Sequence, residues 1–393
     1  MANVRPEGTI LIDLQPRDVN RLVIKPGLNY DNVLTASPLN VYELIGGVKN
    51  KVKMTQLNTP QFTLKPKESC AQWNPTVRMG ARADEIRVED YELEGEMCAD
   101  EFDTNCMRNL RGDGVQMVEL DGSEQLSAIE MAMASLTRES LTNSMAQIAH
   151  FSDPLFGSDQ YLHAEAMDFD SMDVDDSKRA KTMLSKGYGY WAEIQERYAS
   201  GQIREVLNTN DGTTAGNTTK ANGAYELLNR MYEVAPPLLK NWNQAAVNQP
   251  KPIYLVQSGI FRGYKNYLRA LGTEMAHRFI LDGEIVPGVL EFDGFAVVNV
   301  PEWDMFDYLM GAMDPNTGLS KIQRALFTAP RNLTIAYNAV GGDGMNGSSM
   351  IVQRSPVVRD KGKVYTYSAV ALGAGIANDN LIVPAYNTNY GWA

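Results

Sequence analysis

The clearest helix signal in this chain lies in residues 123–150, SEQLSAIEMAMASLTRESLTNSMAQIAH. Apolar residues recur in this stretch at intervals of three and four, which predicts one amphipathic helix. Asp121–Ser123 offers capping oxygens before the pattern, and Asp153–Pro154 stops it. As a helix the 28 residues would span roughly 42 Å, which is long for a globular domain.

Upstream of this helix the sequence is extended. Short β-prone runs at 10–12, 22–24 and 41–45 are separated by prolines. They have no helical core of their own, so we predict an arm that completes its sheet pairing elsewhere in the fold or on another chain. From Lys51 to Val88, polar and apolar residues alternate, which predicts a long exposed β-hairpin. Such a hairpin needs a partner surface to be stable.

Downstream, helix and strand signals alternate without a fixed repeat. Asp293–Gly294 between two β-prone runs predicts a type I′ hairpin. Helices are predicted at 188–207, 224–234 and 259–271, and strands at 253–256, 324–328, 333–337, 350–354 and 364–372. The fold class that follows is α+β, with a mixed middle unit and returning strands at the end.

Charge is distributed unevenly along the chain. The 393 residues include 36 Lys+Arg and 48 Asp+Glu, a net charge of −12. Residues 91–185 hold 20 acidic and only 6 basic side chains, so they account for the whole surplus. A general phosphate-backbone binder concentrates Lys and Arg, so tight nucleic-acid binding is excluded. We expect the acidic stretch to be a solvated face; a surface that repels like charges or receives a basic arm is the alternative.

Cysteine usage and hydropathy limit the cellular context. Cys70, Cys98 and Cys106 fit neither a zinc pattern nor a disulfide framework. The sequence has no signal peptide and no run of about 18 apolar residues. We therefore expect a soluble, cytosolically made protein with no membrane partner.

One acidic cluster is a candidate for cation binding. It comprises Asp168, Asp170, Asp173, Asp175 and Asp176. The spacing misses the EF-hand loop, which needs a Gly at its sixth position and a Glu at its twelfth. We expect a solvated acidic loop at Asp168–Asp176, and the alternative is a calcium or magnesium site there.

Catalytic patterns are weak. Ser258 follows a predicted strand, with His277 and Asp282 downstream, but the GxSxG frame is absent and the order Ser, His, Asp is not the hydrolase order. Its expected role is a helix N-cap. His150 and His163, like His277, are expected at helix ends or on the surface. Nucleotide-binding loops are also absent, so we expect no catalytic, cofactor-binding or metal residues and no cofactor.

Three phrases give the chain a family resemblance. They are Glu94–Cys98, the run Pro287–Phe295 followed by Val300–Asp304, and Thr328–Leu333. Together with the order of elements over essentially the whole length, the chain resembles the major capsid proteins of tailed bacteriophages, which have the Hong Kong 97 fold. Within that family it is similar to proteins of Bacteroidetes-type phages and prophages.

The resemblance implies a division of the chain. An N-terminal arm at 1–49 and an extended loop at 50–92 precede a peripheral domain at 93–185 with its spine helix at 123–150. An axial domain at 186–345 would form contacts around fivefold and sixfold axes, and C-terminal strands at 346–393 would return to the peripheral domain. Lys65 and Lys67 lie in the presumed loop, where some relatives form a cross-link to an Asn. The supporting Glu and the Asn are not identifiable, so that bond is not predicted.

The implied function is that of a virion shell subunit, made in the host cytoplasm. It would self-assemble as hexamers and pentamers into an icosahedral capsid around double-stranded DNA, with weak non-specific DNA contacts. A portal protein is implied, as is a separate scaffolding protein because no long helical leader precedes the arm; decoration proteins are left open. The alternatives are an encapsulin-type bacterial compartment and, in a different class, a soluble hydrolase using Ser258 or a metal enzyme using Asp170.

Overall fold

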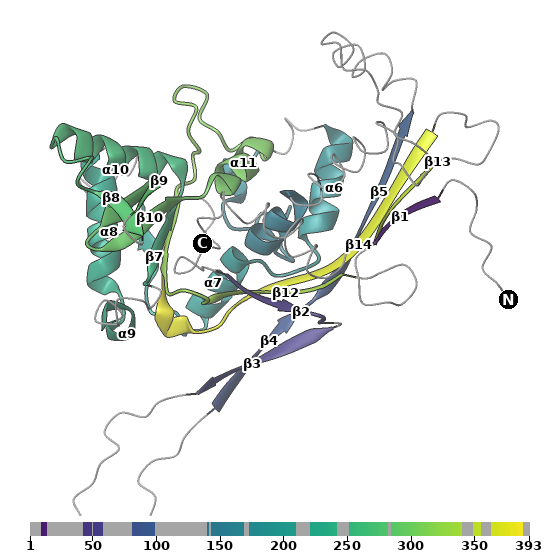
Figure 1. Ribbon diagram of the computed structural model, residues 1–393, viewed down its shortest axis with the longest axis horizontal. Coiled ribbons are helices and arrows are strands. Elements are labelled where there is room, and N and C mark those ends of the chain that lie inside the picture. Colours follow the sequence, from purple (N-terminus) through teal and green to yellow (C-terminus); the bar gives the residue numbers. More distant parts are fainter. Residues whose placement is uncertain are drawn as a thin grey trace, which may run out of the picture.

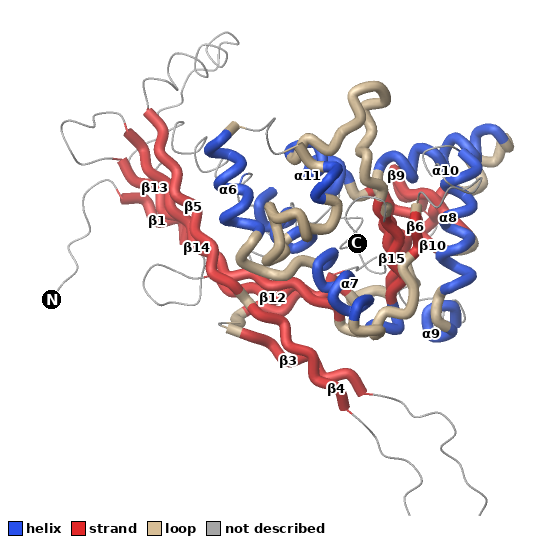
Figure 2. The backbone as a smooth tube through the Cα atoms, turned by 180° about the vertical axis from the view of Figure 1, so that it is seen from behind, coloured by secondary structure: helices blue, strands red, loops and turns tan. Residues whose placement is uncertain are grey.

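The computed structural model describes residues 9–13, 42–48, 50–57, 81–98, 140, 143–168, 173–209, 221–241, 251–281, 284–339, 349–354 and 363–387. Helices and strands mix along the chain and form a six-stranded sheet, a seven-stranded sheet and a two-stranded hairpin. The predicted α+β class is confirmed. In Figures 1 and 2 the six-stranded sheet runs along one side of a wider body, and the hairpin continues beyond the body at the end opposite β1 and β13.

The six-stranded sheet is built around β14 (Lys363–Ile376). β5 (Glu89–Cys98) pairs antiparallel along one edge of β14. β13 (Ser349–Arg354) and β12 (Leu333–Ala339) pair antiparallel along its other edge. β1 (Thr9–Asp13) then pairs with β13, and β2 (Tyr42–Gly46) pairs parallel to β12. At these two strands the predicted arm completes its pairing within its own chain, which was one of the two expected outcomes.

The seven-stranded sheet is buried on both faces. Ile253 and Leu255 of β7 belong to one apolar core, whereas Tyr254 and Val256 belong to the other, which explains a continuous apolar strand. α8 (Ala221–Val234) and α10 (Ser258–Ala270) cover the second face. The strand order is β6 (Leu207–Asn208), β15 (Ile382–Tyr386), β11 (Arg324–Thr328), β7 (Ile253–Val256), β10 (Phe295–Asn299), β9 (Glu284–Phe292) and β8 (Arg278–Leu281).

The turn between β9 and β10 confirms the predicted type I′ hairpin. Asp293 has φ 51° and Gly294 has φ 84°, and a type I′ turn requires a positive φ at both central residues. Phe292 and Phe295 pair directly across the turn. Local turn chemistry therefore fixes the register of these two strands.

The helices differ from the predictions in several places. Residue 140 and residues 143–151 are helical, and the rest of the predicted helix 123–150 lies outside the described residues. The helix predicted at 188–207 is shorter: α7 spans Tyr190–Ala199 and is followed by Gly201 at φ 73°. α9 (Pro237–Asn241) follows α8 after the proline break. Two helices were not predicted, α6 (Val174–Leu184) and α11 (Pro301–Leu309).

β15 was also missed, and it joins the seven-stranded sheet rather than following β13 and β14 into the six-stranded one. Its sequence, IVPAY, is interrupted by Pro384, which argues against a central strand. β6 pairs only with Ala385 and Tyr386, so within the described residues Pro384 faces no strand on that edge. The strand can therefore hold a proline although it lies inside the sheet.

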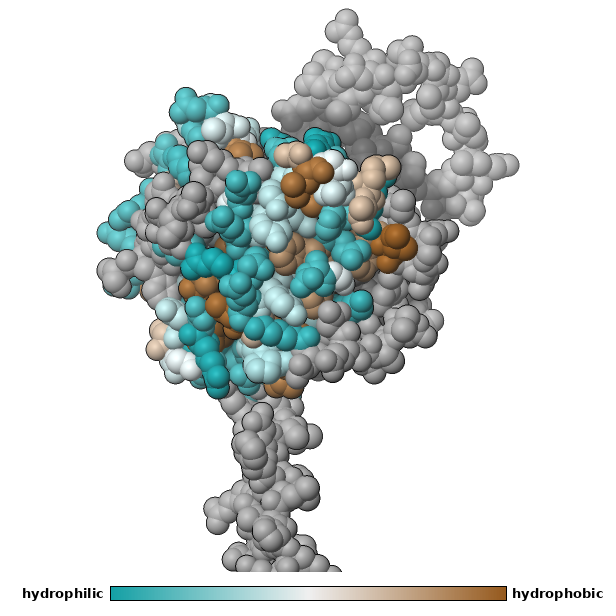
Figure 3. All heavy atoms as spheres, turned by 90° about the vertical axis from the view of Figure 1, so that its left-hand side faces the viewer, coloured by the Kyte–Doolittle hydropathy of each residue, from teal (hydrophilic) through white to brown (hydrophobic). Residues whose placement is uncertain are grey.

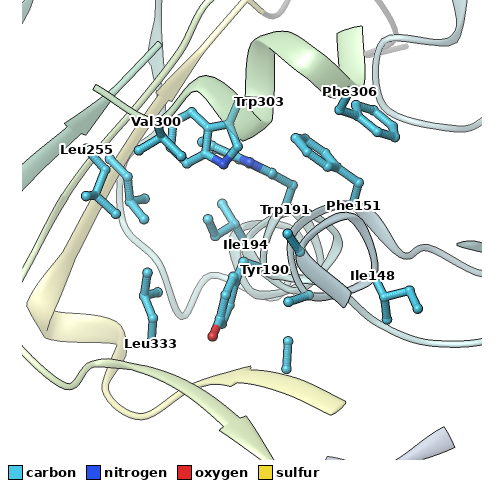
Figure 4. Close-up of a cluster of buried hydrophobic side chains, with 14 of the residues drawn as sticks. Ile148, Phe151, Tyr190, Trp191, Ile194, Leu255, Val300, Trp303, Phe306 and Leu333 are labelled. Atoms are coloured by element: carbon cyan, nitrogen blue, oxygen red, sulfur yellow. The ribbon is translucent and has the colours of Figure 1, made fainter. Parts of the chain in front are cut away.

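An aromatic core joins α7, α11, β2 and residues 143–151 (Figure 4). The indole Nε1 of Trp303 donates to Nδ1 of His150 at 3.2 Å, and Nε2 of His150 lies 3.3 Å from the Tyr42 hydroxyl. An indole only donates, so Nδ1 is unprotonated and Nε2 carries the hydrogen. Burial lowers the pKa of His150 to about 3. His150 is the penultimate residue of its helix, and His163 is the N-cap of the short helix η2 (Ala164–Ala166), so both lie at helix ends, one of the two expected positions, and both are buried.

Candidate assembly surfaces

A two-stranded hairpin projects from the body (Figure 1). β3 (Lys51–Leu57) and β4 (Ala81–Arg87) pair antiparallel, and in the described part of the chain they pair only with each other. Lys51 and Lys53 form exposed ion pairs with Glu85, at 3.0 and 3.5 Å, and such pairs contribute about 0–1 kcal/mol each. The predicted hairpin is confirmed over these two strands, and residues 58–80, including Lys65 and Lys67, lie outside the described residues. A hairpin of this kind is marginally stable unless another surface covers it.

The base of the hairpin packs tightly on the six-stranded sheet. Ile86 and Val88 are buried against Ala371. A Cβ on Gly373 would lie 2.0 Å from the carbonyl oxygen of Arg87, and a Cβ on Gly375 would lie 2.5 Å from Ile86. Only glycine at these positions lets β4 cross the sheet so closely.

A second exposed surface lies at the end of the seven-stranded sheet. We call Leu271, Met275 and Ile280 the tip residues; their exposed fractions are 57, 69 and 59%. They come from the end of α10, the turn after it, and the edge strand β8. Figure 3 shows apolar side chains among hydrophilic ones on the side of the molecule that carries α8 and α10. A group of exposed apolar side chains is typical of protein contacts, whereas a single one is not.

α11 is apolar on two sides. Trp303 and Phe306 face the core, and Phe306 stacks on Phe151 with ring centroids 3.8 Å apart. Met305, Tyr308 and Leu309 are spaced three and four apart on the other side, which puts them on one face of the helix. All three are exposed in the described structure. α11 therefore offers a third apolar surface.

The Asp-rich segment is the start of α6. Asp173 is the N-cap, and its side chain accepts a hydrogen bond from the backbone N–H of Asp175 at 2.8 Å. Asp175 and Asp176 lie in the first turn, where acidic residues stabilise the positive end of the helix dipole. Asp170 lies outside the described residues. In the part of the chain that is described, no three His, Cys, Asp or Glu side chains gather as a metal site.

Ser258 is not the helix N-cap that was expected. It is the first residue of α10, and its hydroxyl donates to Asp304 and to Oδ1 of Asn299. The Ser258 backbone N–H also donates to Asp304, at 3.1 Å, so the Asp304 carboxylate caps α10 from a neighbouring element. Among the described residues no histidine bonds to Ser258, and Asp282 lies outside them. The described residues therefore do not assemble a Ser–His–Asp site at Ser258.

Sequence reasoning missed a buried polar network beneath α11. Both carboxylate oxygens of Asp307 accept from Nη1 of Arg324, at 2.9 and 2.8 Å. The same carboxylate accepts from Gln257 at 2.6 Å and Ser320 at 2.5 Å. Asp307 and Arg324 are 0 and 1% exposed. An arrangement this enclosed holds elements together and offers no room for a substrate.

Glu302 should make stability depend on pH. Burial raises its pKa to about 7, the nearby Asp304 adds to the shift, and Oε2 is buried without a hydrogen-bond partner in the described structure. The carboxyl is neutral in both states below pH 4.5, whereas the folded protein must ionise a buried group above pH 7. Stability therefore falls as pH rises through this window. Glu302→Gln is expected to raise the free energy of unfolding by up to about 3 kcal/mol at pH 8 and to leave it unchanged at pH 4.5.

Urea unfolding at the two pH values measures this effect. Glu196→Gln, at an exposed position on α7, is the control and should change neither value. An equal effect of Glu302→Gln at both pH values would contradict the assignment.

No protein-family model and no curated protein matches the sequence. Structures of phage capsids superpose on nearly the whole chain. For "Cyanophage Pam1 capsid asymmetric unit", the TM-score is 0.47 at 11% identity, over 94% of this chain and 96% of the other.

Two further structures overlap to a similar extent. For "Satellite phage P4 procapsid including size determination (Sid) protein", the TM-score is 0.45 at 9% identity, over 90% of this chain and 96% of the other. For "Capsid of native GTA particle computed with C5 symmetry", it is 0.43 at 12% identity, over 92% and 91%. Separately, no helix in the described ranges is long and apolar enough to cross a membrane.

Proposed function

We propose that this chain is a major capsid protein, which assembles as hexamers and pentamers into an icosahedral shell around packaged double-stranded DNA. The observation that carries the proposal is the β3–β4 hairpin. It projects from the body, has no other strand partner among the described residues, and is firmly seated at its base. A structure that is marginal in isolation gains stability when a neighbouring subunit covers it.

The other exposed surfaces also favour repeated contacts. The tip residues and the outer face of α11 lie on different elements, so one subunit can meet several neighbours at once. Individually modest contacts become strong when they repeat around a closed shell. An enzymatic function has no comparable support, because Ser258 bonds to Asp304 and Asn299, and no histidine bonds to it among the described residues.

The partners proposed are other copies of the chain, a separate scaffolding protein, a portal protein and, weakly, the packaged DNA. β5 supplies one reason for the weak DNA contact. Asp90, Glu92 and Glu94 are exposed and alternate along this strand, so they share one face of the sheet. A row of carboxylates repels a phosphate backbone. The shell wall would then contain DNA without binding it tightly.

Negative-stain electron microscopy with size-exclusion sizing tests the proposal. The purified chain is examined alone and after co-expression with a candidate scaffolding protein. We expect closed particles tens of nanometres across, or rings of five or six subunits. A 43.5 kDa monomer under both conditions would contradict the shell function. Particles that hold protein cargo instead of DNA would favour the encapsulin-type alternative.

A further inference from the structure

β5 forms one edge of the six-stranded sheet. It pairs with β14 along one side and with no other described strand along the other. A cavity of about 1290 Å³ is lined on this side by the four consecutive residues Tyr91–Glu94. Successive side chains of a strand point to opposite faces, so a cavity that touches four in a row lies along the edge of the strand. The backbone N–H and C=O groups of this edge are therefore accessible to an added strand.

The open edge of β5 is acidic. Asp90, Glu92 and Glu94, which we call the acidic row, are exposed on one face of the strand. None of the three has an ion pair within the described residues. Two copies of this edge would place like charges opposite one another, which is destabilising. A strand that adds here therefore needs basic side chains, which argues against a symmetric contact of β5 with itself.

β3 has a complementary open edge. Among the described strands it pairs only with β4. Lys51 and Lys53 are exposed on one face of β3, and both pair with the single carboxylate of Glu85. This face therefore has a surplus of positive charge. Two β3 edges would oppose lysines in the same way that two β5 edges oppose carboxylates.

The backbone of β3 also presents these two lysines at its open edge. The Val88 N–H donates to the carbonyl oxygen of Asn50 at 3.0 Å, so these two residues form a hydrogen-bonded pair of the antiparallel ladder. Such pairs alternate with pairs that are not hydrogen-bonded, and the register puts Lys51 and Lys53 in the second kind. Their N–H and C=O groups therefore point away from β4 and towards the open edge.

We propose that the β3 edge of one subunit pairs with the β5 edge of a second copy, with the two lysines beside the acidic row. The two edges of one chain cannot meet, because the hairpin and β5 extend in opposite directions from Val88 (Figures 1 and 2). Each subunit therefore gives one edge and receives another, and contacts of this kind form closed rings when the rotation allows. This pairing deepens the proposed capsid function and rests on it, since it names the surface that covers the hairpin.

The joined surface stays acidic. Two lysines meet the three carboxylates of the acidic row, and Glu85 adds a fourth carboxylate. The surface therefore still repels a phosphate backbone, as proposed for the shell wall.

Charge reversal of each edge tests the pairing. In the first variant, Glu92→Lys and Glu94→Lys reverse the β5 edge. In the second, Lys51→Glu and Lys53→Glu reverse the β3 edge, and Glu85→Lys keeps the ion pairs within the hairpin. Each full chain is co-expressed with the candidate scaffolding protein and examined by size-exclusion sizing and electron microscopy. We expect the assembled fraction of either variant to fall by at least about tenfold, because like charges then meet at every contact.

Restoration of assembly separates paired charges from general damage. A chain that carries both sets of changes again opposes unlike charges, so it should assemble to within about twofold of the parent. A mixture of the two variants should also assemble, but only with the variants alternating around each ring. A ring of six can alternate and a ring of five cannot, so we expect sixfold rings without fivefold ones.

Asp159→Lys with Glu165→Lys is the matched control for the first variant. It makes the same change in charge at two exposed positions that belong to neither edge and do not line the cavity. We expect the control to assemble like the parent, and every variant to keep the circular dichroism spectrum of the parent. If the acidic row served only to prevent strand pairing, the reversed β5 edge, which is still charged, would also assemble like the parent.

Three results would overturn the pairing. They are normal assembly of the reversed variants, no restoration in the combined chain and the mixture, and loss of assembly in the control. Normal shells from the reversed variants would leave the capsid function standing. Open chains of subunits that depend on both edges but never close would sustain the pairing and contradict the capsid function. A parent that stays monomeric throughout would contradict both.

Discussion

Asp307→Asn is expected to lower the free energy of unfolding by about 3–5 kcal/mol, the usual loss when one partner of a buried ion pair is removed. The carboxylate is fully buried and accepts four hydrogen bonds from Arg324, Gln257 and Ser320. Asparagine keeps the shape but leaves the buried Arg324 without a counter-charge. Because domains are stable by only about 5–15 kcal/mol, the yield of folded protein should fall sharply.

Urea unfolding followed by tryptophan fluorescence measures this loss. Asp159→Asn, at an exposed position, is the control and should change stability by less than about 0.5 kcal/mol. Replacing both partners, with Asp307→Leu and Arg324→Met together, should lose less than the two single changes added, because no buried charge is then left unpaired. A loss below about 1 kcal/mol for Asp307→Asn would contradict the predicted role of this ion pair.

Met275→Asp combined with Ile280→Asp is expected to abolish rings and shells while the subunit stays folded. Both side chains are more than half exposed in the subunit, so new carboxylates there remain hydrated in the monomer. At a subunit contact the same carboxylates would lose water without gaining a partner, which costs several kcal/mol per group. The penalty repeats at every contact around a ring.

Electron microscopy and size-exclusion sizing measure assembly, and circular dichroism measures folding. Leu238→Asp is the matched control, because Leu238 is 58% exposed but lies on α9, away from the tip residues. The control should assemble like the parent. Shells formed by the double variant, or the loss of shells in the control as well, would contradict a specific contact at the tip residues.

The parts of the fold that sequence predicts are those with strong local signals. β7 matches its predicted range because a short apolar run flanked by polar residues suits a fully buried strand. The type I′ turn at Asp293–Gly294 was predicted correctly because few dipeptides tolerate two positive φ values. The hairpin was also recognisable, because alternation continues over seven paired positions on each strand.

The missed helices lack such signals. α11 has apolar residues on both faces, one buried and one exposed, so it shows no amphipathic period. Pro301 at its first position and Glu302 and Asp304 in its first turn were the available clues. In α6 only Leu184 is buried, which leaves almost no apolar stripe to detect. Its start was visible only as an acidic cluster, which suggested a loop.

The polar contacts could not be predicted because their partners are distant in sequence. Arg197 meets Asp379 across 182 positions, and Gln257 meets Asp307 across 50. The N-cap expected at Ser258 was wrong for the same reason, since Asp304 of α11 accepts from the backbone N–H at the start of α10. The close crossing of β4 over Gly373 has no local signal either, because Arg87 and Ile86 are distant in sequence. These features depend on tertiary packing, which local patterns do not encode.

Each of the two larger sheets has a strand that is synthesised after the strands it pairs with. β14 lies between β5 and the pair β12 and β13, and β15 lies between β6 and β11. A nascent chain that ends before residue 363 would display the open edges of strands whose partners do not yet exist, and such edges promote aggregation. The six-stranded sheet is complete once Ile376 has been synthesised, and the seven-stranded sheet once Tyr386 has. We therefore expect the nascent chain to need chaperones until β14 and β15 have been synthesised.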